Sequence, residues 1–308
     1  MKIIIELPTW LGDTLMATPA IENVNFYFQN PEITLLGSRV SIEALKNHPN
    51  VKKTYVLEKN YFKLYKNIKC LNEFDFYFSF RSSLRSKFIK FFVLAKRKYQ
   101  FNKFFYNDGH QVEKYNNFIN DSLEIKTSPK KLLLHNLSYK KKVDRKILGI
   151  NPGASYGSSK RWYPERFSQV ATELSSNYDI VIFGADTEEA IANDIEKYLL
   201  ENGVFNYQNL VGKTSIEELI NEISKLDLLI TGDSGPMHLA AALEISTVSI
   251  FGPTNDKETS QWMNEKSLIV KKNLICQPCM KRTCPLKHHN CMNQIKAADV
   301  LEAIDSLS

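Results

Sequence analysis

The segment GDSGPMHLAAAL, residues 232–243, combines an acid, a hydroxyl and two glycines directly before a helix-forming run. It follows an apolar run, and Pro236 suits the first position of a helix, so a strand, a tight loop and a helix are predicted in succession. The first turn of a helix has unpaired N–H groups and a partial positive charge, which stabilise an anion by roughly 0.3–1 kcal/mol. Ser234 and Gly235 add a hydroxyl and an unobstructed backbone to this corner, which is therefore a candidate site for an anion, next to Asp233. The alternative is that Asp233 or Ser234 is a plain N-cap.

A second corner follows the apolar run 147–151 and carries two adjacent cations. In NPGASYGSSKRWYPERF, residues 151–167, small residues expose the backbone, and Lys160 with the next arginine suits a diphosphate. A basic surface turn has the same appearance. The stretch lacks the Gly-Lys-Ser/Thr of a Walker loop, and neither half begins with the three-glycine dinucleotide spacing. Gly153 and Ser155 are the other candidates in this corner.

A third corner, FGPTND at residues 251–256, again ends a predicted strand with small and hydroxyl-bearing residues. Gly252 and Thr254 are its candidate ligand-binding residues. Three such corners at one edge of a sheet favour a ligand site over three unrelated turns.

The first half of the chain supplies a carboxylate at a similar position. LPTWLGDTLMATPAIENV, residues 7–24, places Asp13 and Thr14 where a strand gives way to a helix. Asp13 is a candidate general base, a role that requires a carboxylate within hydrogen-bond reach of an acceptor hydroxyl. The alternative is that Asp13 is only the N-cap of a helix over 14–28.

Four of the five cysteines lie near the C-terminus as C-x2-C-x4-C-x6-C, at Cys276, Cys279, Cys284 and Cys291, while Cys70 stands alone. The first interval is typical of tetrahedral zinc sites, but the last pair lacks the short spacing of common zinc modules. Disulfides are not expected in a reducing cytosol, so structural zinc and buried thiols remain as alternatives.

Strands and helices alternate through both halves, which predicts parallel sheets covered by helices. The predicted strands are 2–7, 33–36, 51–57, 74–80, 147–151, 179–183, 226–231 and 247–251. The predicted helices are 14–28, 42–46, 166–175, 187–200, 215–224, 236–243 and 297–307. Because 308 residues exceed one ordinary domain and the charged stretch 141–146 interrupts the pattern, we expect two Rossmann-like domains, 1–145 and 146–308.

The composition, 43% hydrophobic and 24% charged, is that of a soluble globular protein. Glu6 interrupts the first apolar run, so we expect no signal peptide and a cytosolic protein. The net charge of +6 is unevenly distributed, because residues 81–105 carry eight lysines and arginines and no acid. With its interleaved phenylalanines this segment predicts an amphipathic basic helix for an anionic membrane surface, or else a solvated face. Nucleic acid is not an expected partner, since no recognised binding module accompanies the segment.

Taken together, five segments resemble, in order, the motifs of the ADP-heptose:lipopolysaccharide heptosyltransferases, glycosyltransferase family 9. They are LGDTLMATPAI, NPGASYGSSKRWYPERF, GDSGPMHLAAAL, GPT and CQPCMKRTCPLKHHNC. The last is most similar to the heptosyltransferase II branch. The resemblance runs from residue 7 to residue 291 and is poorest over 50–140. It implies an α/β protein of GT-B type, with two Rossmann-like domains facing across a cleft.

The resemblance also implies a reaction: heptose moves, with inversion, from ADP-L-glycero-β-D-manno-heptose to the inner core of lipopolysaccharide. The acceptor would be heptosyl-Kdo-lipid A at the inner face of the inner membrane. Asp13 would be the base and Lys160 the cation on the diphosphate. No cofactor and no metal is implied, and ADP-heptose is the donor substrate.

Further positions follow from the same motifs. Glu188 would meet the ribose or adenine, with Asp186 and Glu189 as alternatives, and His238 would contact the donor or else be a satisfied core histidine. The donor-binding residues implied are Gly153, Ser155, Lys160, Glu188, Asp233, Ser234, Gly235, Met237, His238, Gly252 and Thr254. The acceptor-binding residues are Thr14, Arg81 and Arg85, the arginines facing phosphates or Kdo carboxylates unless they are only solvated.

Several other functions share these features. A heptosyltransferase acting on another core sugar or on a protein would differ only in its acceptor. A GT-B-like sugar-nucleotide epimerase would need the anion corners but no acceptor. A non-catalytic nucleotide-binding protein would keep Lys160 without depending on Asp13.

Overall fold

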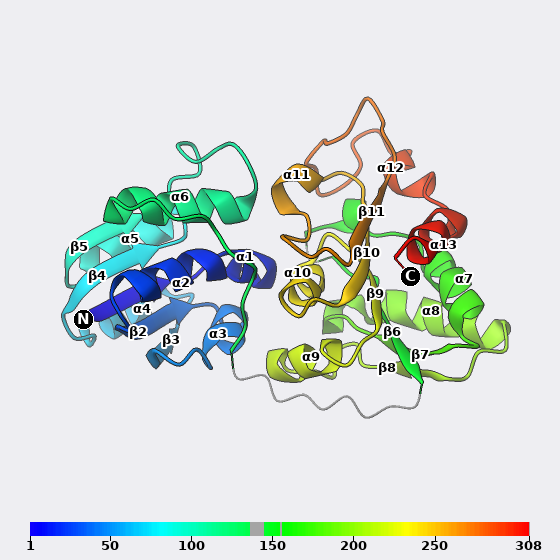
Figure 1. Ribbon diagram of the computed structural model, residues 1–308, viewed down its shortest axis with the longest axis horizontal. Coiled ribbons are helices and arrows are strands. Elements are labelled where there is room, and N and C mark those ends of the chain that lie inside the picture. The colour runs from blue at the N-terminus through cyan, green and yellow to red at the C-terminus, as the bar shows by residue number, and fades with distance from the viewer. Residues whose placement is uncertain (136–144, 155, 308) are drawn as a thin grey trace. The chain divides into compact units, whose positions relative to one another are not determined.

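The computed structural model describes residues 1–135, 145–154 and 156–307, which divide into two compact units, Met1–Leu137 and Ser138–Ser308 (Figure 1). The boundary predicted between residues 145 and 146 adjoins the stretch 136–144, which lies outside the described residues, as does Ser155. That boundary stays a prediction.

The first unit is built on a parallel five-stranded sheet of order β3-β2-β1-β4-β5. Its strands are β1 (Lys2–Glu6), β2 (Glu32–Gly37), β3 (Val51–Val56), β4 (Phe74–Ser79) and β5 (Ala95–Gln100). Its helices are α1 (Leu11–Met16), α2 (Thr18–Tyr27), α3 (Arg39–Leu45), α4 (Tyr61–Lys69), α5 (Leu84–Phe92) and α6 (Gln111–Leu123). The central strand is apolar on both faces, with Ile3, Ile4 and Ile5 fully buried, as a strand between two helical layers requires.

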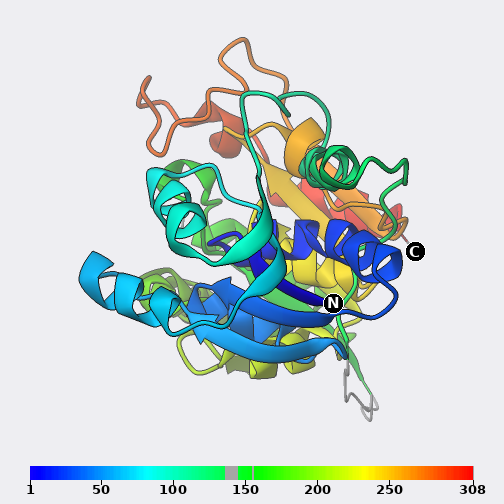
Figure 2. The same cartoon turned by 90° about the vertical axis from the view of Figure 1, so that its left-hand side faces the viewer.

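Helices cover both faces of this sheet. Figure 2 shows α4 and α5 on one side and α2 and α6 on the other. Leu64, Ile68 and Ile89 from α4 and α5 pack against Ile4 and Tyr77 of the sheet. Apolar burial of this kind, at about 25 cal/mol per Å², is what holds the layers together.

The second unit has a parallel six-stranded sheet of order β11-β10-β9-β6-β7-β8. Its strands are β6 (Lys146–Asn151), β7 (Tyr178–Ile182), β8 (Tyr207–Asn209), β9 (Leu228–Gly232), β10 (Ser246–Phe251) and β11 (Ser267–Lys271). Its longer helices are α7 (Pro164–Leu174), α8 (Glu189–Glu201), α9 (Ile216–Ile223), α10 (Gly235–Ala242) and α13 (Ala297–Asp305). Short helical turns are η1 (Ser158–Lys160), η2 (Asp186–Glu188), α11 (Asp256–Thr259) and α12 (Asn290–Asn293).

Both sheets place their first strand internally, so that the chain winds outward first on one side and then on the other. The direction changes between β1 and β4 in the first unit and between β6 and β9 in the second. Loops leaving two such strands diverge, which opens a crevice at their carboxyl ends where ligands bind in open α/β sheets. The two forks, β1/β4 and β6/β9, are therefore where functional side chains are to be sought.

Most predicted strands are confirmed, but the helix predicted over 14–28 is wrong in its extent. The chain forms α1 and α2 in succession, joined at Ala17. Pro19 has no N–H to donate to the carbonyl four residues earlier, and the hydroxyl of Thr18 donates to that carbonyl of Leu15 instead, at 2.7 Å.

The basic segment 81–105 is also not one helix. Helix α5 ends at Phe92, and β5 follows at the edge of the sheet, where it pairs only with β4. Exposed Lys96 and its neighbours on this strand discourage pairing with another chain. Among the helices of the described residues, none combines the length and apolar character needed to cross a bilayer.

Candidate functional site

A buried polar network lies at the fork between β6 and β9. Asn151 ends β6, and its side-chain amide donates to the hydroxyls of Thr231, at 3.2 Å, and Ser234, at 3.1 Å. The two hydroxyls are 2.9 Å apart, and Asn151 and Thr231 are buried. Sequence reasoning singled out Ser234 but missed the other two, although each is a polar residue ending an apolar strand. The network fixes the loop that leads into α10.

Lys160 lies at the same fork. Its Nζ donates to Oδ2 of Asp233 at 2.5 Å and to the carbonyl of Asp233 at 3.2 Å, and it lies 4.8 Å above the ring of Tyr156. The side chains of Lys160 and Asp233 are only 11% and 7% exposed. The fork thus holds a fixed cation, and the carboxylate of Asp233 positions that cation.

Helix α10 begins beside this pair. Its first turn leaves the N–H groups of Gly235 and Met237 without an acceptor inside the helix, and Pro236 has none to offer. The side chains of Met237 and His238 are buried, so a ligand would meet the backbone of this turn rather than these side chains. Backbone donors and Lys160 together make the β6/β9 fork suited to an anion.

Glu188 is buried and is the last residue of η2, the short helical turn that follows β7. Its Oε2 accepts a hydrogen bond from the N–H of Ala185 at 2.9 Å. The carboxyl group packs directly on Gly153, where a Cβ atom would lie 2.0 Å from each carboxylate oxygen. A side chain at position 153 would therefore displace the carboxylate of Glu188, a packing role for Gly153 that the sequence did not indicate.

The third corner follows β10. The carbonyl of Gly252 accepts a hydrogen bond from the Gln277 side chain at 2.6 Å. The hydroxyl of Thr254 is buried, and within the part of the chain that the structure describes it has no hydrogen-bond partner. A buried hydroxyl without a partner is costly, so this one is poised to bond a ligand atom.

The fork of the first unit centres on Glu6, which sequence reasoning used only to exclude a signal peptide. This fully buried carboxylate accepts hydrogen bonds from Tyr77, at 2.6 Å, and from Ser79 and Ser86, each at 2.8 Å. Burial raises the pKa of Tyr77 well above its usual value, and the charge of Glu6 adds to this effect. Nη1 of Arg81 lies 3.7 Å from Oε1 of Glu6, and this ion pair holds the guanidinium group at the β1/β4 fork.

Asp13 is the third residue of α1 and is partly exposed. The N-cap is Trp10, so the alternative assignment of Asp13 as an N-cap is wrong. Burial, and after it the charge of Asp13, raises the pKa of Tyr115. Thr14 is fully buried, and its hydroxyl donates to the Trp10 and Pro8 carbonyls at 2.9 and 3.3 Å, so it stabilises the turn.

Arg85, on α5, has a guanidinium group 5.8 Å from the ring of Tyr61. Its Nε and Nη2 atoms are buried and, among the described residues, have no hydrogen-bond partner. A cation in this state favours an incoming carboxylate or phosphate.

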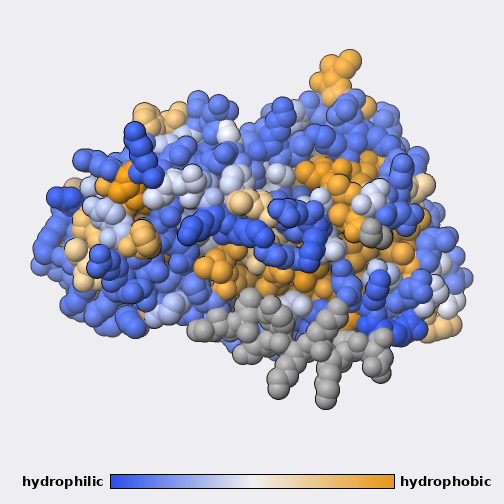
Figure 3. Space-filling view, in the orientation of Figure 1, coloured by the Kyte–Doolittle hydropathy of each residue, from blue (hydrophilic) through white to orange (hydrophobic). Residues whose placement is uncertain are grey.

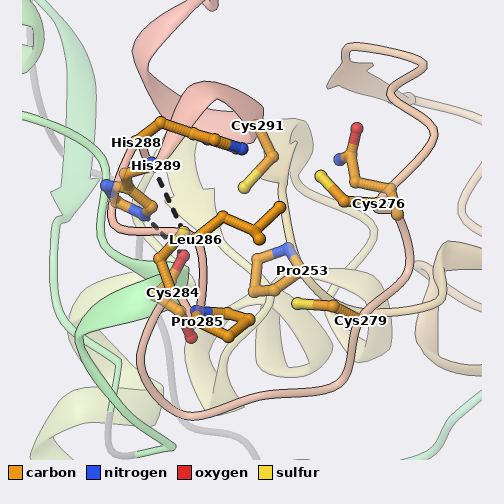
Figure 4. Close-up of a pocket in the computed structure, with 11 residues that line it drawn as sticks. Pro253, Cys276, Cys279, Cys284, Pro285, Leu286, His288, His289 and Cys291 are labelled. Carbon is orange, nitrogen blue, oxygen red and sulfur yellow. Dashed lines mark hydrogen bonds between the residues drawn. The ribbon is translucent and has the colours of Figure 1, made fainter.

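The four C-terminal cysteines line one pocket next to the third corner, together with Pro253 (Figure 4). Burial raises the pKa of Cys291 to about 11, and the neighbouring thiols of Cys279, Cys284 and Cys276 contribute. The four cysteines thus lie around a single pocket.

Known proteins with similar chains share this architecture. The lipooligosaccharide heptosyltransferase 2 of Campylobacter jejuni subsp. jejuni serotype O:2 is 44% identical over 317 residues, covering 100% of this chain and 98% of that protein. A lipooligosaccharide heptosyltransferase 2 of Haemophilus influenzae is 26% identical over 88% of both chains. The solved structure of E. coli ADP-heptose LPS heptosyltransferase II superimposes with a TM-score of 0.82 at 22% identity, covering 100% and 98% of the two chains, and shows the same fold.

The sequence model of glycosyltransferase family 9 (heptosyltransferase) matches residues 62–290, most of the chain. A likeness of this extent to transferases does not favour the epimerase alternative. With its two Rossmann-like units, the chain belongs to glycosyltransferase family 9, the heptosyltransferases.

Proposed function

We propose that this protein transfers heptose from ADP-heptose to the inner core of lipopolysaccharide. The observation that carries the proposal is the fixed cation Lys160 beside the first turn of α10 at the β6/β9 fork. A departing ADP needs charge stabilisation at its diphosphate, and a lysine with backbone N–H groups supplies it. The names of the Campylobacter and Haemophilus relatives support the same reaction.

In this mechanism Asp13 accepts the proton of the acceptor hydroxyl while that oxygen attacks the anomeric carbon of heptose. The bond from the anomeric carbon to the phosphate oxygen breaks on the opposite face, so the configuration inverts. The negative charge that develops on ADP is stabilised by Lys160 and by the N–H groups of α10. No step requires a metal or an organic cofactor.

The remaining donor contacts are assigned by position. Ser234 and Gly235 would bind the phosphate and sugar hydroxyls, Gly252 and Thr254 would border the nucleotide, and Glu188 would accept from a ribose hydroxyl. The buried, unpartnered Thr254 hydroxyl supports a ligand at this edge of the sheet, since a donor atom would satisfy it.

On the acceptor side we assign Arg81 and Arg85 to anionic groups such as the carboxylates of Kdo or the phosphates of lipid A. The buried Nε and Nη2 of Arg85, which have no partner among residues 1–135, 145–154 and 156–307, support this assignment. Carboxylates and phosphates match the planar fork of a guanidinium group. Thr14 is not included, because its hydroxyl already serves the turn before α1.

We further propose that α5 rests on the cytoplasmic surface of the inner membrane. Its exposed side bears Leu84, Lys87 and Phe91, which recur at helical spacing, and Leu84 and Phe91 are 80% and 76% exposed. Apolar side chains beside lysines suit an anionic bilayer.

A flotation assay tests this contact. The unchanged protein should float with vesicles of anionic phospholipid, and the Phe91→Ser variant should float less. Neither protein should float with neutral vesicles. Equal flotation of both proteins would refute this contact.

The decisive test of the reaction compares Asp13→Asn and Asp13→Ala with the unchanged protein and with Glu73→Gln, which alters an exposed acid of the same unit. Transfer from ADP-heptose to heptosyl-Kdo-lipid A should fall by about 10²–10⁴-fold in both Asp13 variants, because a general base contributes that much. ADP affinity, measured by calorimetry, should stay within about twofold. Retained transfer would eliminate Asp13 as the base.

The acceptor is tested separately. Truncated lipopolysaccharide cores and a protein acceptor are offered with the same donor. Turnover of the protein alone would reject the lipopolysaccharide assignment while leaving the family and the donor site intact.

A further inference from the structure

Residues 272–289, between β11 and α12, form no helix or strand, yet they contact the loop that follows β6 and the loop that follows β10. The N–H of Met280 donates to the carbonyl of Pro253 at 2.9 Å. The N–H of Ser159 donates to the carbonyl of Arg282 at 3.2 Å, and its hydroxyl donates to the carbonyl of Lys281 at 2.5 Å. Because Lys160 is the next residue after Ser159, this segment buttresses the loop that carries the cation.

Apolar packing does little to hold the segment in place. Ile275 is fully exposed, Leu286 is 58% exposed, and Figure 3 shows an apolar projection at the top of the view, over this part of the chain. Met280, Lys287 and His289 adopt left-handed backbone conformations that are unfavourable for residues other than glycine. A long irregular segment with strained residues and a small core needs another source of stability.

Four cysteines are distributed over residues 272–289 and the helix α12 that follows them. Cys276, Cys279 and Cys284 belong to the segment, and Cys291 stands on α12. All four line the same pocket, and Figure 4 shows the sulfurs of Cys276, Cys279 and Cys291 directed toward its interior. The sulfur of Cys284 accepts a hydrogen bond from the N–H of His289 at 3.4 Å, a contact that also stabilises a metal-bound thiolate.

The two histidines beside the pocket are not available as ligands. His289 Nε2 lies 2.8 Å from the carbonyl of Ser159 and must donate to it, so Nδ1 accepts from the Tyr163 hydroxyl at 3.1 Å. His288 Nδ1 accepts from the N–H of Asn290 at 3.0 Å, which places its proton on Nε2. A neutral imidazole in either position has no lone pair left for a metal, so the sulfurs are the ligand set.

A second group of ligand-type residues, the Glu22 cluster (Glu22, His48 and His135), is tighter but unsuited to a metal. Its three ligand atoms lie within 4.8 Å of one another, and among the described residues no other such group of three is as close. However, His48 Nδ1 accepts from the N–H of Asn50 at 3.1 Å, so Nε2 carries the proton that it donates to Glu22. This cluster is a hydrogen-bonded group.

We propose that Cys276, Cys279, Cys284 and Cys291 bind one zinc ion as four thiolates, and that this ion fixes residues 272–289 on α12, next to the loops that carry Ser159 and Pro253. No three of these sulfurs lie within 4.8 Å of one another, so binding one ion requires the cysteine side chains and the segment that carries them to move closer. Each thiol releases its proton to solvent on binding, and the site carries a net charge of −2. An all-sulfur tetrahedral set with the spacing C-x2-C suits structural zinc and leaves no position open for catalysis.

The first test is the metal content of the full-length protein, purified without a metal-affinity tag. We expect about one zinc per chain by mass spectrometry. Cys276→Ser and Cys284→Ser should each lower this at least about fivefold, whereas Cys70→Ser, which alters an exposed cysteine of the first unit, should not. Absence of zinc from the unchanged protein overturns the proposal, as does one iron per chain in its place.

A second measurement does not depend on the variants folding. Removing metal from the unchanged protein with a chelator should lower its melting temperature and expose four additional thiols to a thiol reagent. Cobalt added afterwards should produce intense thiolate-to-metal charge-transfer absorption. Four thiols that react equally before and after chelation, with no cobalt absorption, also overturn it.

Discussion

The ion pair between Lys160 and Asp233 permits a quantitative prediction about stability. We consider Lys160→Met, which keeps the length of the side chain but removes its charge. Asp233, 7% exposed, would then keep a buried carboxylate without its cation at 2.5 Å. Leaving one partner of a buried pair uncompensated costs about 3–5 kcal/mol.

The companion variants separate this cost from the loss of packing. Asp233→Asn leaves Lys160 as the unpaired charge and should be destabilising as well. The double variant carries no unpaired charge, so it should regain about 1–3 kcal/mol relative to the sum of the single variants. Lys225→Met is the matched control, because Lys225 pairs with Glu222 at 2.5 Å but both side chains are about one-third exposed. That pair should contribute at most about 1 kcal/mol.

Thermal unfolding followed by circular dichroism measures the effect. A loss of 3–5 kcal/mol in a unit of this size corresponds to a drop of roughly 6–20 °C in the melting temperature of the second unit. Urea unfolding provides an independent value. The reasoning is refuted if Lys160→Met costs no more than Lys225→Met, or if the double variant shows no coupling.

Three other expectations follow from single contacts. Gly153→Ala should lower the free energy of unfolding, measured by urea titration, by about 1–3 kcal/mol, because the added Cβ overlaps the Glu188 carboxylate. The control is Gly232→Ala, which should cost less in the same titration, because its Cβ comes no closer than 3.4 Å to its neighbours. Thr254→Val should leave unfolding unchanged within about 1 kcal/mol, since the buried hydroxyl has no partner in the described chain, but it should weaken ADP binding in calorimetry; unchanged binding would contradict the ligand role. Burial alone would raise the pKa of Glu22, but hydrogen bonds from the two histidines of its cluster outweigh burial and lower it from 4.5 to about 2. Its stabilisation is complete above pH 4.5 and is lost as the pH falls toward 2, so Glu22→Gln should flatten the acid limb of the stability profile, and an unaltered limb would contradict this.

Much of the fold could be predicted from periodicity alone. The buried strands β1, β4, β6, β9 and β10 are short apolar runs bounded by turn residues, and such runs are recognisable without tertiary information. Strands at or near the edges, β5 and β11, were missed because their charged or mixed composition depends on which neighbour they pair with. Helix α5 was extended too far for the same reason.

Of the candidate site, the residues could be predicted from the sequence in part, but their contacts could not. Lys160 and Asp233 stand in recognisable strand-to-helix corners, so their types and spacing were informative. The contact between Lys160 and Asp233 could not be predicted. The two residues are 73 positions apart, and their loops meet only because of the order of the strands in the sheet. Glu6 was passed over because a single acid at the end of a strand gives no sign of its three hydroxyl partners in the sequence.

The contact between Gly153 and Glu188 couples two loops that leave neighbouring strands. A side chain at position 153 displaces the carboxylate of Glu188, so the cost of a substitution at 153 should fall when position 188 carries a shorter side chain. Libraries that aim to change which nucleotide sugar the protein accepts should therefore randomise both positions at once. Scanning either position singly would discard combinations that fold well together.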